Sequence, residues 1–257
     1  MIWLYTLASV LVVSLVSLIG VLFLIASEGR LRRSLSFLVA LATGALFGDV
    51  LIHLLPQIFT DALTRGNTLL PSLLILAGLL LFFVLEKFLR WSHRHGLDDC
   101  ACSPADHRPT APVGQLALIS DGFHNLLDGV IIAVSFMASP AIGLATTLAV
   151  VLHEIPQEIG DFAVLIHSGF TRRRALLFNL LSASLAIVGA VLTLAIGARV
   201  ASLAEFLLPL AAGGFLYLAG SDLVPELHKI TDFKKSLIQF AAFLLGITAM
   251  LLLLFLG

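Results

Sequence analysis

Apolar segments of membrane length follow one another along the whole chain. Each holds the ~20 residues that a helix needs to cross a bilayer, and mostly short connections separate them. A mean hydropathy of +1.06, with 59% hydrophobic and 12% charged residues, excludes a water-soluble core. We therefore predict an all-α, polytopic membrane protein with eight transmembrane helices, at 2–26, 35–59, 70–91, 114–138, 141–167, 174–198, 204–227 and 235–256.

The basic residues indicate how these helices are oriented. Thirteen of the fifteen Lys and Arg lie in or beside the connections after the first, third, fifth and seventh predicted spans. Because cytoplasmic connections are enriched in Lys and Arg, we expect both termini outside the cytoplasm, in a plasma or inner cell membrane. The net charge of −1, without a long basic run, argues against nucleic acid as a partner.

Two neighbouring spans, 114–138 and 141–167, each carry a dense polar block. On a helix with about 100° per residue, each block forms one stripe. An ionised side chain that faces lipid at the bilayer centre costs about 2.5–3.5 kcal/mol, so we expect the stripes to face each other around a bound cation. The stripes consist of Asp121, His124, Asn125 and Asp128 in the first span, and His153, Glu154, Gln157, Glu158 and Asp161 in the second.

The spacing within the stripes suggests a metal centre near the middle of the membrane. His124 and Asp128 are four residues apart, as are His153 and Gln157, so each pair projects from one face of its helix. Mixed nitrogen and oxygen ligands favour borderline divalent ions such as zinc, iron(II), manganese or cadmium. Asn125 and Glu154 follow the two histidines directly, so they project about 100° further round their helices. They would hold a second ion or orient the ligands.

Other intramembrane polar residues predict a pathway for the ion. Toward the cytoplasm from the centre we expect acidic side chains from three spans, whereas the second span places polar groups on the other side. The predicted pathway residues are Asp121, Glu158, Asp161, Asp222 and Glu226 on the cytoplasmic side, with His53 and Asp49 in the second span.

The second and seventh spans carry related signals. The segment Gly48-Asp49-Val-Leu-Ile-His53-Leu-Leu-Pro56 resembles Gly220-Ser-Asp222-Leu-Val-Pro225 in the order of a glycine, an acid and a proline. These spans cross the membrane in opposite senses. We therefore predict a 3+2+3 inverted repeat, with spans 1–3 related to spans 6–8 around the central pair.

The long connection at 92–112 lies within what we expect to be a single transporter domain, 1–257. Imidazole and thiol groups suit borderline and soft metals, so the connection is either a labile metal-collecting tract or a solvated linker. Its candidate ligands are His93, His95, Cys100, Cys102 and His107.

Two other functions fit parts of this pattern. His153-Glu154-x-x begins like the H-E-x-x-H motif of an intramembrane metalloprotease, but Gln157 takes the place of the second histidine. A proton-coupled cation antiporter would use the acids as a relay, although it needs fewer histidines at the membrane centre.

At these residues the chain resembles the ZIP (Zrt-, Irt-like) family of divalent metal transporters. The resemblance covers all eight predicted spans and is carried by His-Asn-x-x-Asp-Gly at 124–129 and His-Glu-Ile-Pro-Gln-Glu-Ile-Gly-Asp-Phe-Ala at 153–163. It implies a transporter, not an enzyme, that imports zinc, iron, manganese or related ions and commonly forms homodimers. By resemblance, a bundle containing spans 4 and 5 would move against a scaffold containing spans 2 and 7.

The resemblance also implies the ligands. The metal centre would be formed by His124, Asp128, His153 and Gln157, with Asn125 and Glu154 beside it. This sequence departs from the close subgroup at Gln157, where histidine is usual. Since glutamine is a weaker zinc ligand, we expect broader acceptance of iron(II), manganese or cadmium.

Overall fold

The structure, a computed structural model, describes residues 1–19, 28–98, 111–197 and 202–255. Within these ranges the regular structure is helical and contains no strand, so the all-α prediction is confirmed. The elements are α1 (Ile2–Val16), η1 (Ser17–Ile19), α3 (Glu28–Gly48), η2 (Asp49–Leu54), α4 (Leu55–Thr64), α5 (Leu69–Asp98), α6 (Ala111–Ala138), α7 (Pro140–His167), α8 (Arg172–Ala183), α9 (Leu185–Gly197), α10 (Leu203–Leu218), η3 (Ala219–Leu223), α11 (Val224–His228) and α12 (Phe233–Leu253).

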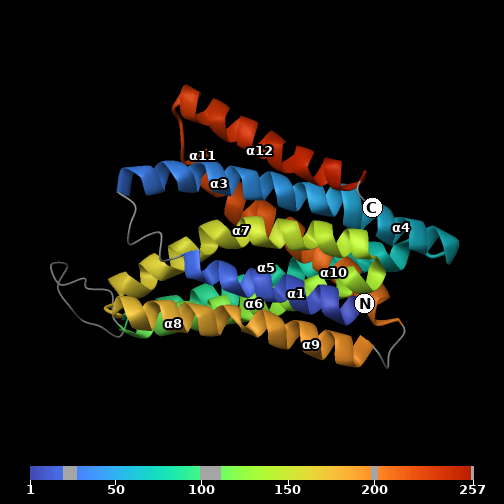
Figure 1. The fold of residues 1–257 in the computed structure, drawn as a ribbon, viewed down its shortest axis with the longest axis horizontal. Coiled ribbons are helices and arrows are strands. Elements are labelled where there is room, and N and C mark those ends of the chain that lie inside the picture. Colours follow the sequence, from blue (N-terminus) through green and yellow to red (C-terminus); the bar gives the residue numbers. More distant parts are fainter. Residues whose placement is uncertain (20–27, 99–110, 198–201, 256–257) are drawn as a thin grey trace.

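The helices run side by side along the long axis of the molecule, and both termini lie at the same end (Figure 1). Among the described residues, seven helical stretches are long and apolar enough to cross a membrane. The protein is therefore an all-α polytopic membrane protein. Helix α7, at the predicted fifth span, is equally long but less apolar because the second polar block lies within it. The count of eight crossings stays a prediction.

The second and seventh predicted spans are both interrupted in the same way. In each, an α-helix passes into a π-helical turn, η2 or η3, and a short α-helix with a proline in its first turn follows. Pro56 and Pro225 lack the N–H that a regular helix would use. π-Turns of this kind occur often at functional sites, and their matched positions support the predicted inverted repeat.

The packing of these spans is matched as well. Helix α3 packs along α12, and α10 packs along α5. Exchanging spans 1–3 with spans 6–8 converts the first helix pair into the second. This exchange is what a two-fold relation between the two halves requires.

Glycines allow the central helices to touch. A Cβ on Gly129 of α6 would lie 1.9 Å from the carbonyl oxygen of Ala186 in α9, and one on Gly189 of α9 would lie 2.1 Å from the carbonyl oxygen of Leu126 in α6. Only residues without a side chain permit this approach, which is common between membrane helices. The contact fixes α6, which carries the first polar block, against α9.

The connection after α5 is shorter than predicted. Helix α5 continues to Asp98, so residues 92–98 of the predicted 92–112 connection are helical, and α6 already begins at Ala111. His93 and His95 lie on this extension of α5. Cys100, Cys102 and His107 lie outside the described residues.

Candidate metal centre

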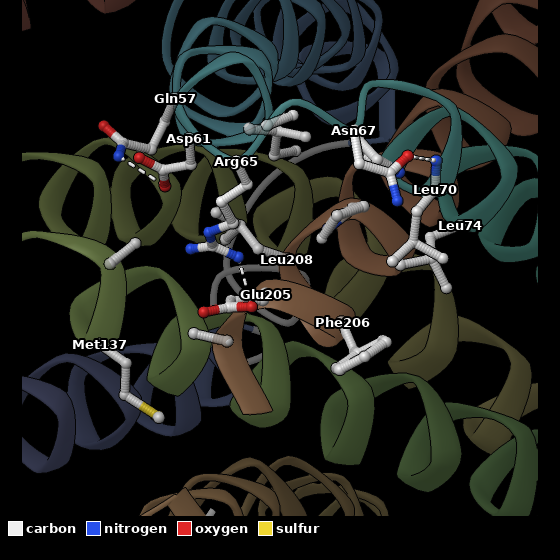
Figure 2. Close-up of a pocket in the computed structure, with 16 residues that line it drawn as sticks. Gln57, Asp61, Arg65, Asn67, Leu70, Leu74, Met137, Glu205, Phe206 and Leu208 are labelled. Atoms are coloured by element: carbon white, nitrogen blue, oxygen red, sulfur yellow. Dashed lines mark hydrogen bonds and ion pairs between the residues drawn. The ribbon is translucent and has the colours of Figure 1, made fainter. Parts of the chain in front are cut away.

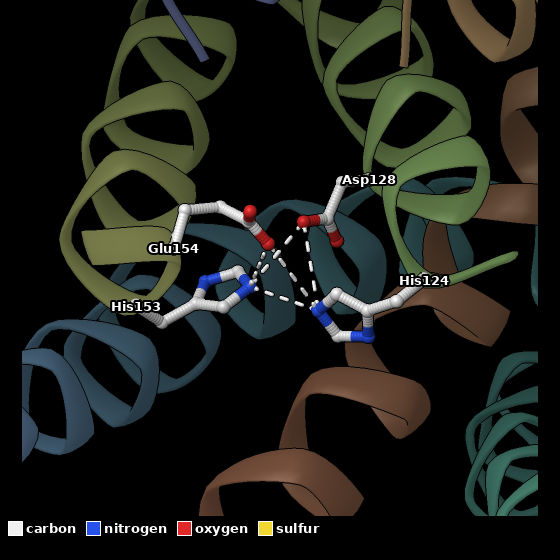
Figure 3. A group of neighbouring side chains, drawn as sticks. All are labelled: His124, Asp128, His153 and Glu154. Atoms are coloured by element: carbon white, nitrogen blue, oxygen red, sulfur yellow. Dashed lines mark hydrogen bonds and ion pairs between the residues drawn. The ribbon is translucent and has the colours of Figure 1, made fainter. Parts of the chain in front are cut away.

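Four side chains from the two polar blocks converge between α6 and α7. His124 and Asp128 come from α6, and His153 and Glu154 come from α7 (Figure 3). One potential ligand atom from each of the four lies within 4.8 Å of those of the other three. The polar stripes of α6 and α7 therefore face each other.

The spacing of these atoms suits a single small cation. Nε2 of His153 lies 3.2 Å from Nε2 of His124, 3.3 Å from Oδ2 of Asp128 and 3.5 Å from Oε1 of Glu154. Nε2 of His124 lies 3.6 Å from Oε1 of Glu154 and 3.7 Å from Oδ2 of Asp128. Zinc binds nitrogen and oxygen at about 2.0–2.2 Å, and the ligand atoms of a tetrahedral site are about 1.63 times as far from one another, about 3.3–3.6 Å.

The carboxylates of this cluster are buried without ordinary partners. Glu154 is 0% exposed, and neither of its carboxylate oxygens has a hydrogen-bond partner among the described residues. Oδ2 of Asp128 is also buried and has no hydrogen-bond partner among the described residues. A buried acceptor left in this state costs about 1–3 kcal/mol, and more when it is charged. A cation bound between the four groups would remove that cost.

The histidine on α7 is oriented for ligation. Nδ1 of His153 lies 3.2 Å from the carbonyl oxygen of Ala149, one turn earlier in the helix. Since a carbonyl only accepts hydrogen bonds, this contact places the proton on Nδ1. The lone pair of Nε2 is then directed at the cluster, as in metal-ligating histidines that donate their other N–H to a carbonyl.

Gln157, predicted as the fourth ligand, does not belong to this four-residue cluster. Its Nε2 lies 3.5 Å from Oδ1 of Asp121, which also accepts a 2.9 Å hydrogen bond from Nδ2 of Asn125. These three residues form a second polar group on the same two helices. Glu154, predicted beside the centre, provides the fourth converging atom among the histidines and acids, and ligation by Gln157 stays a prediction.

A cavity of about 250 Å³ opens beside the centre. His153 and Gln157 of α7 line it, together with Asp222 of η3 and Glu226 of α11. Two residues of the predicted centre and two of its predicted cytoplasmic pathway therefore line the same cavity. Helix α11, which contributes Glu226 to the lining of this cavity, lies away from the end that holds the termini (Figure 1).

Farther along α7 a buried acid has a partner from another helix. Glu158 is 0% exposed and accepts a hydrogen bond from Nδ2 of Asn179 in α8. Sequence reasoning missed Asn179, although a lone amide within the apolar span 174–198 was a signal for it. The next predicted pathway residue, Asp161, is only partly buried.

The polar residues of the second span form a separate pair on η2. Nδ1 of His53 lies 3.7 Å from Oδ1 of Asp49, and both side chains are buried. Oδ2 of Asp49 accepts a 3.0 Å hydrogen bond from Oγ1 of Thr146. This bond links η2 to α7 about two turns before His153, so the pair lies near the centre without belonging to the converging cluster.

A larger cavity, of about 570 Å³, lies near the end of the bundle that holds both termini (Figure 2). Polar side chains of α4 face it, including Gln57, whose Nε2 donates a 2.9 Å hydrogen bond to Oδ2 of Asp61. Arg65, which caps α4, forms an ion pair with Glu205 of α10. We call this cavity the vestibule.

The fold and the centre together define a polytopic membrane protein with a candidate divalent-metal site inside its helical bundle. Comparison with known sequences agrees with this class of protein and identifies the family within it. The family described as ZIP Zinc transporter matches residues 1–112 and 92–254, which is almost the whole chain. The chain belongs to the ZIP zinc transporter family.

Individual relatives agree with this membership. The chain is 32% identical to zinc transporter ZIP13 of Pongo abelii, over 97% of this chain and 78% of that protein. It is 31% identical to zinc transporter YKE4 of Saccharomyces cerevisiae, over 95% and 78% of the two chains. It is 29% identical to metal cation symporter ZIP14 of Xenopus tropicalis, over 98% and 69%.

Proposed function

We propose that this protein carries zinc and related divalent ions across a cell membrane toward the cytoplasm, and that His124, Asp128, His153 and Glu154 hold the ion on the way. The observation that carries the proposal is the convergence of two imidazole nitrogens and two buried carboxylates at separations that suit one tetrahedral ion. Family membership supplies divalent metal ions as the cargo.

The proposed pathway runs along the length of the bundle. An ion enters at the vestibule, passes the Asp49–His53 pair on η2 and reaches the centre between α6 and α7. It leaves through the 250 Å³ cavity, past Asp222 and Glu226. The excess of basic residues in the connections on the exit side supports this direction, with the exit side in the cytoplasm and both termini outside.

The ligand set favours zinc but does not restrict the site to it. Two imidazoles and two carboxylates suit zinc, and also iron(II), manganese and cadmium. The amide of Gln157, in contact with Asp121, offers a second, weaker set of oxygen ligands on the exit side. This combination supports transport of several divalent metals. From the family we further propose that the protein works as a homodimer and as a transporter, not as an enzyme.

Uptake by purified protein in liposomes tests the proposal. Zinc or cadmium added outside should reach a metal-sensing dye inside when wild-type protein is present. Replacing both histidines of the centre, His124→Ala with His153→Ala, should reduce the rate to that of empty liposomes. His228→Ala, which removes an exposed histidine at the end of α11, is the matched control and should keep the rate. Equal uptake by wild type and the double variant would end the assignment.

A further inference from the structure

A groove of about 430 Å³ lies on the surface of the bundle between α6 and the pair α8 and α9. Apolar side chains line it, and the largest are between 37% and 55% exposed. In a membrane-spanning bundle, such a groove faces the hydrocarbon of the bilayer. Its main lining residues are Ile119 and Phe123 of α6, and Phe178, Leu181 and Leu185 of α8 and α9.

The groove is suited to a hydrocarbon chain and not to a polar ligand. Ser182 provides the one side-chain hydroxyl among its lining residues, and that hydroxyl donates a 3.1 Å hydrogen bond to the carbonyl oxygen of Leu118. The floor is formed at Gly122, where a Cβ would lie 2.8 Å from Cδ1 of Leu185. The polar side chain is thus already satisfied, and the missing side chain of Gly122 allows Leu185 to pack against α6 at the floor of the groove.

A basic residue continues the groove at one end. Residues 178, 181, 182 and 185 lie on one stripe of α8 and α9, and the position one turn before Phe178 on that stripe is Arg174. At 1.5 Å per residue the two are about 6 Å apart along the axis. Arg172 and Arg173 are also exposed, but they project about 160° and about 100° away from Arg174 around the helix.

We propose that the groove binds an anionic phospholipid, with one acyl chain between α6 and α8 and the phosphate paired with Arg174. Helix α8 begins at the end of the bundle opposite both termini (Figure 1), which is the end predicted to be cytoplasmic. The cytoplasmic leaflet carries anionic lipids that attract basic residues at the membrane surface. Charge and apolar shape therefore match the same ligand.

A second copy of the chain fits this face less well. In a two-fold dimer within one membrane, both copies have the same orientation, so their Arg172–Arg174 triplets would meet at the same depth. Like charges in contact oppose association. A lipid brings the opposite charge and fills the groove between α6 and α8 without that repulsion.

Lipid retention by purified protein tests the proposal, and it does not depend on which ion the chain carries. Protein in neutral detergent is titrated with dioleoyl phosphatidylglycerol or with dioleoyl phosphatidylcholine, and bound lipid is counted by native mass spectrometry. The anionic lipid should bind more tightly. Arg174→Gln should weaken it about fivefold, the effect expected of one basic residue at an anionic surface. Arg173→Gln, with the same change in charge, should keep the wild-type affinity.

A second pair of variants tests the acyl chain. Leu181→Trp fills the groove and should abolish preferential lipid binding, whereas Leu177→Trp should not, because Leu177 is equally exposed, at 53%, but lies outside the groove. Three outcomes would overturn the proposal. They are equal losses in the two arginine variants, competition by glycerol phosphate as strong as that by the intact lipid, and dissociation of a dimer by Leu181→Trp.

Discussion

At the scale of single residues, the identity of the fourth ligand matters most. Residues 153 and 157 share one face of α7, whereas residue 154 projects about 100° away from residue 153. In the structure Glu154 meets His124 and Asp128, and Gln157 contacts Asp121. Two adjacent residues of α7 thus contribute to one centre.

This arrangement predicts an order of effects on zinc binding. Glu154→Gln removes a charged ligand, so it should weaken zinc binding by more than about 100-fold, above the roughly 10–100-fold usual for a residue that only orients a ligand. Gln157→Ala removes a group outside the cluster and should stay below that range. Isothermal titration of both variants in detergent measures this. A larger loss in Gln157→Ala would identify Gln157 as the fourth ligand.

Single residues also show which parts of the site could be predicted from the sequence and which could not. The i,i+4 pair on α6 and the presence of His153 at the centre could be predicted because they depend only on the geometry of a single helix. The closeness of Glu154 to the other three side chains could not be predicted in the same way, because it depends on how α7 is rotated against α6. The contact of Glu158 with Asn179 is equally nonlocal, since it joins α7 to α8.

At the scale of elements, apolarity determined most helix positions, and the interruptions escaped prediction. Described helices lie within each predicted span, since each apolar segment must satisfy its backbone within itself. The π-turns η2 and η3 and the break between α8 and α9 at Ser184 do not alter hydropathy. The sequence signals were the prolines after η2 and η3, which indicated an irregularity without its form.

Close packing of α6 and α9 should be sensitive to a single methyl group. In Gly129→Ala the new Cβ would collide with the carbonyl oxygen of Ala186, so the helices must separate at a cost of about 1–3 kcal/mol. Gly160→Ala is the control, because nothing lies within 4 Å of its Cβ position. Thermal melting in detergent should show a lower midpoint for the first variant only. Equal midpoints would mean that the α6–α9 contact can relax.

Zinc should stabilise the pair α6 and α7, because its ligands come from both helices. A ligand that binds only the folded state stabilises it by about 2.7 kcal/mol at 100 times its dissociation constant. The melting midpoint of wild-type protein should therefore rise with zinc concentration. The variant with His124→Ala and His153→Ala should melt at one temperature with or without zinc. A similar rise in both proteins would locate the stabilising ion elsewhere.

At the scale of the whole molecule, the distribution of basic residues and the positions of the two termini indicate the same topology. Thirteen of fifteen basic residues fall on one side of the predicted topology, and the two termini lie at the same end of the bundle. An even number of crossings produces both results. The vestibule lies near the end with the termini, and the 250 Å³ cavity is lined in part by residues of η3 and α11, farther from that end. The proposed inward path therefore begins on the side with few basic residues.

Labelling of introduced cysteines in intact cells tests this orientation. With Cys100 and Cys102 replaced by serine, Asn67→Cys places a thiol in the exposed connection between α4 and α5, on the side of the termini. A membrane-impermeant maleimide should label it from outside. Lys229→Cys, exposed between α11 and α12, should react only after the membrane is permeabilised, because positive connections stay in the cytoplasm. The reverse pattern would invert the topology, and the proposed direction of transport would then lose its support.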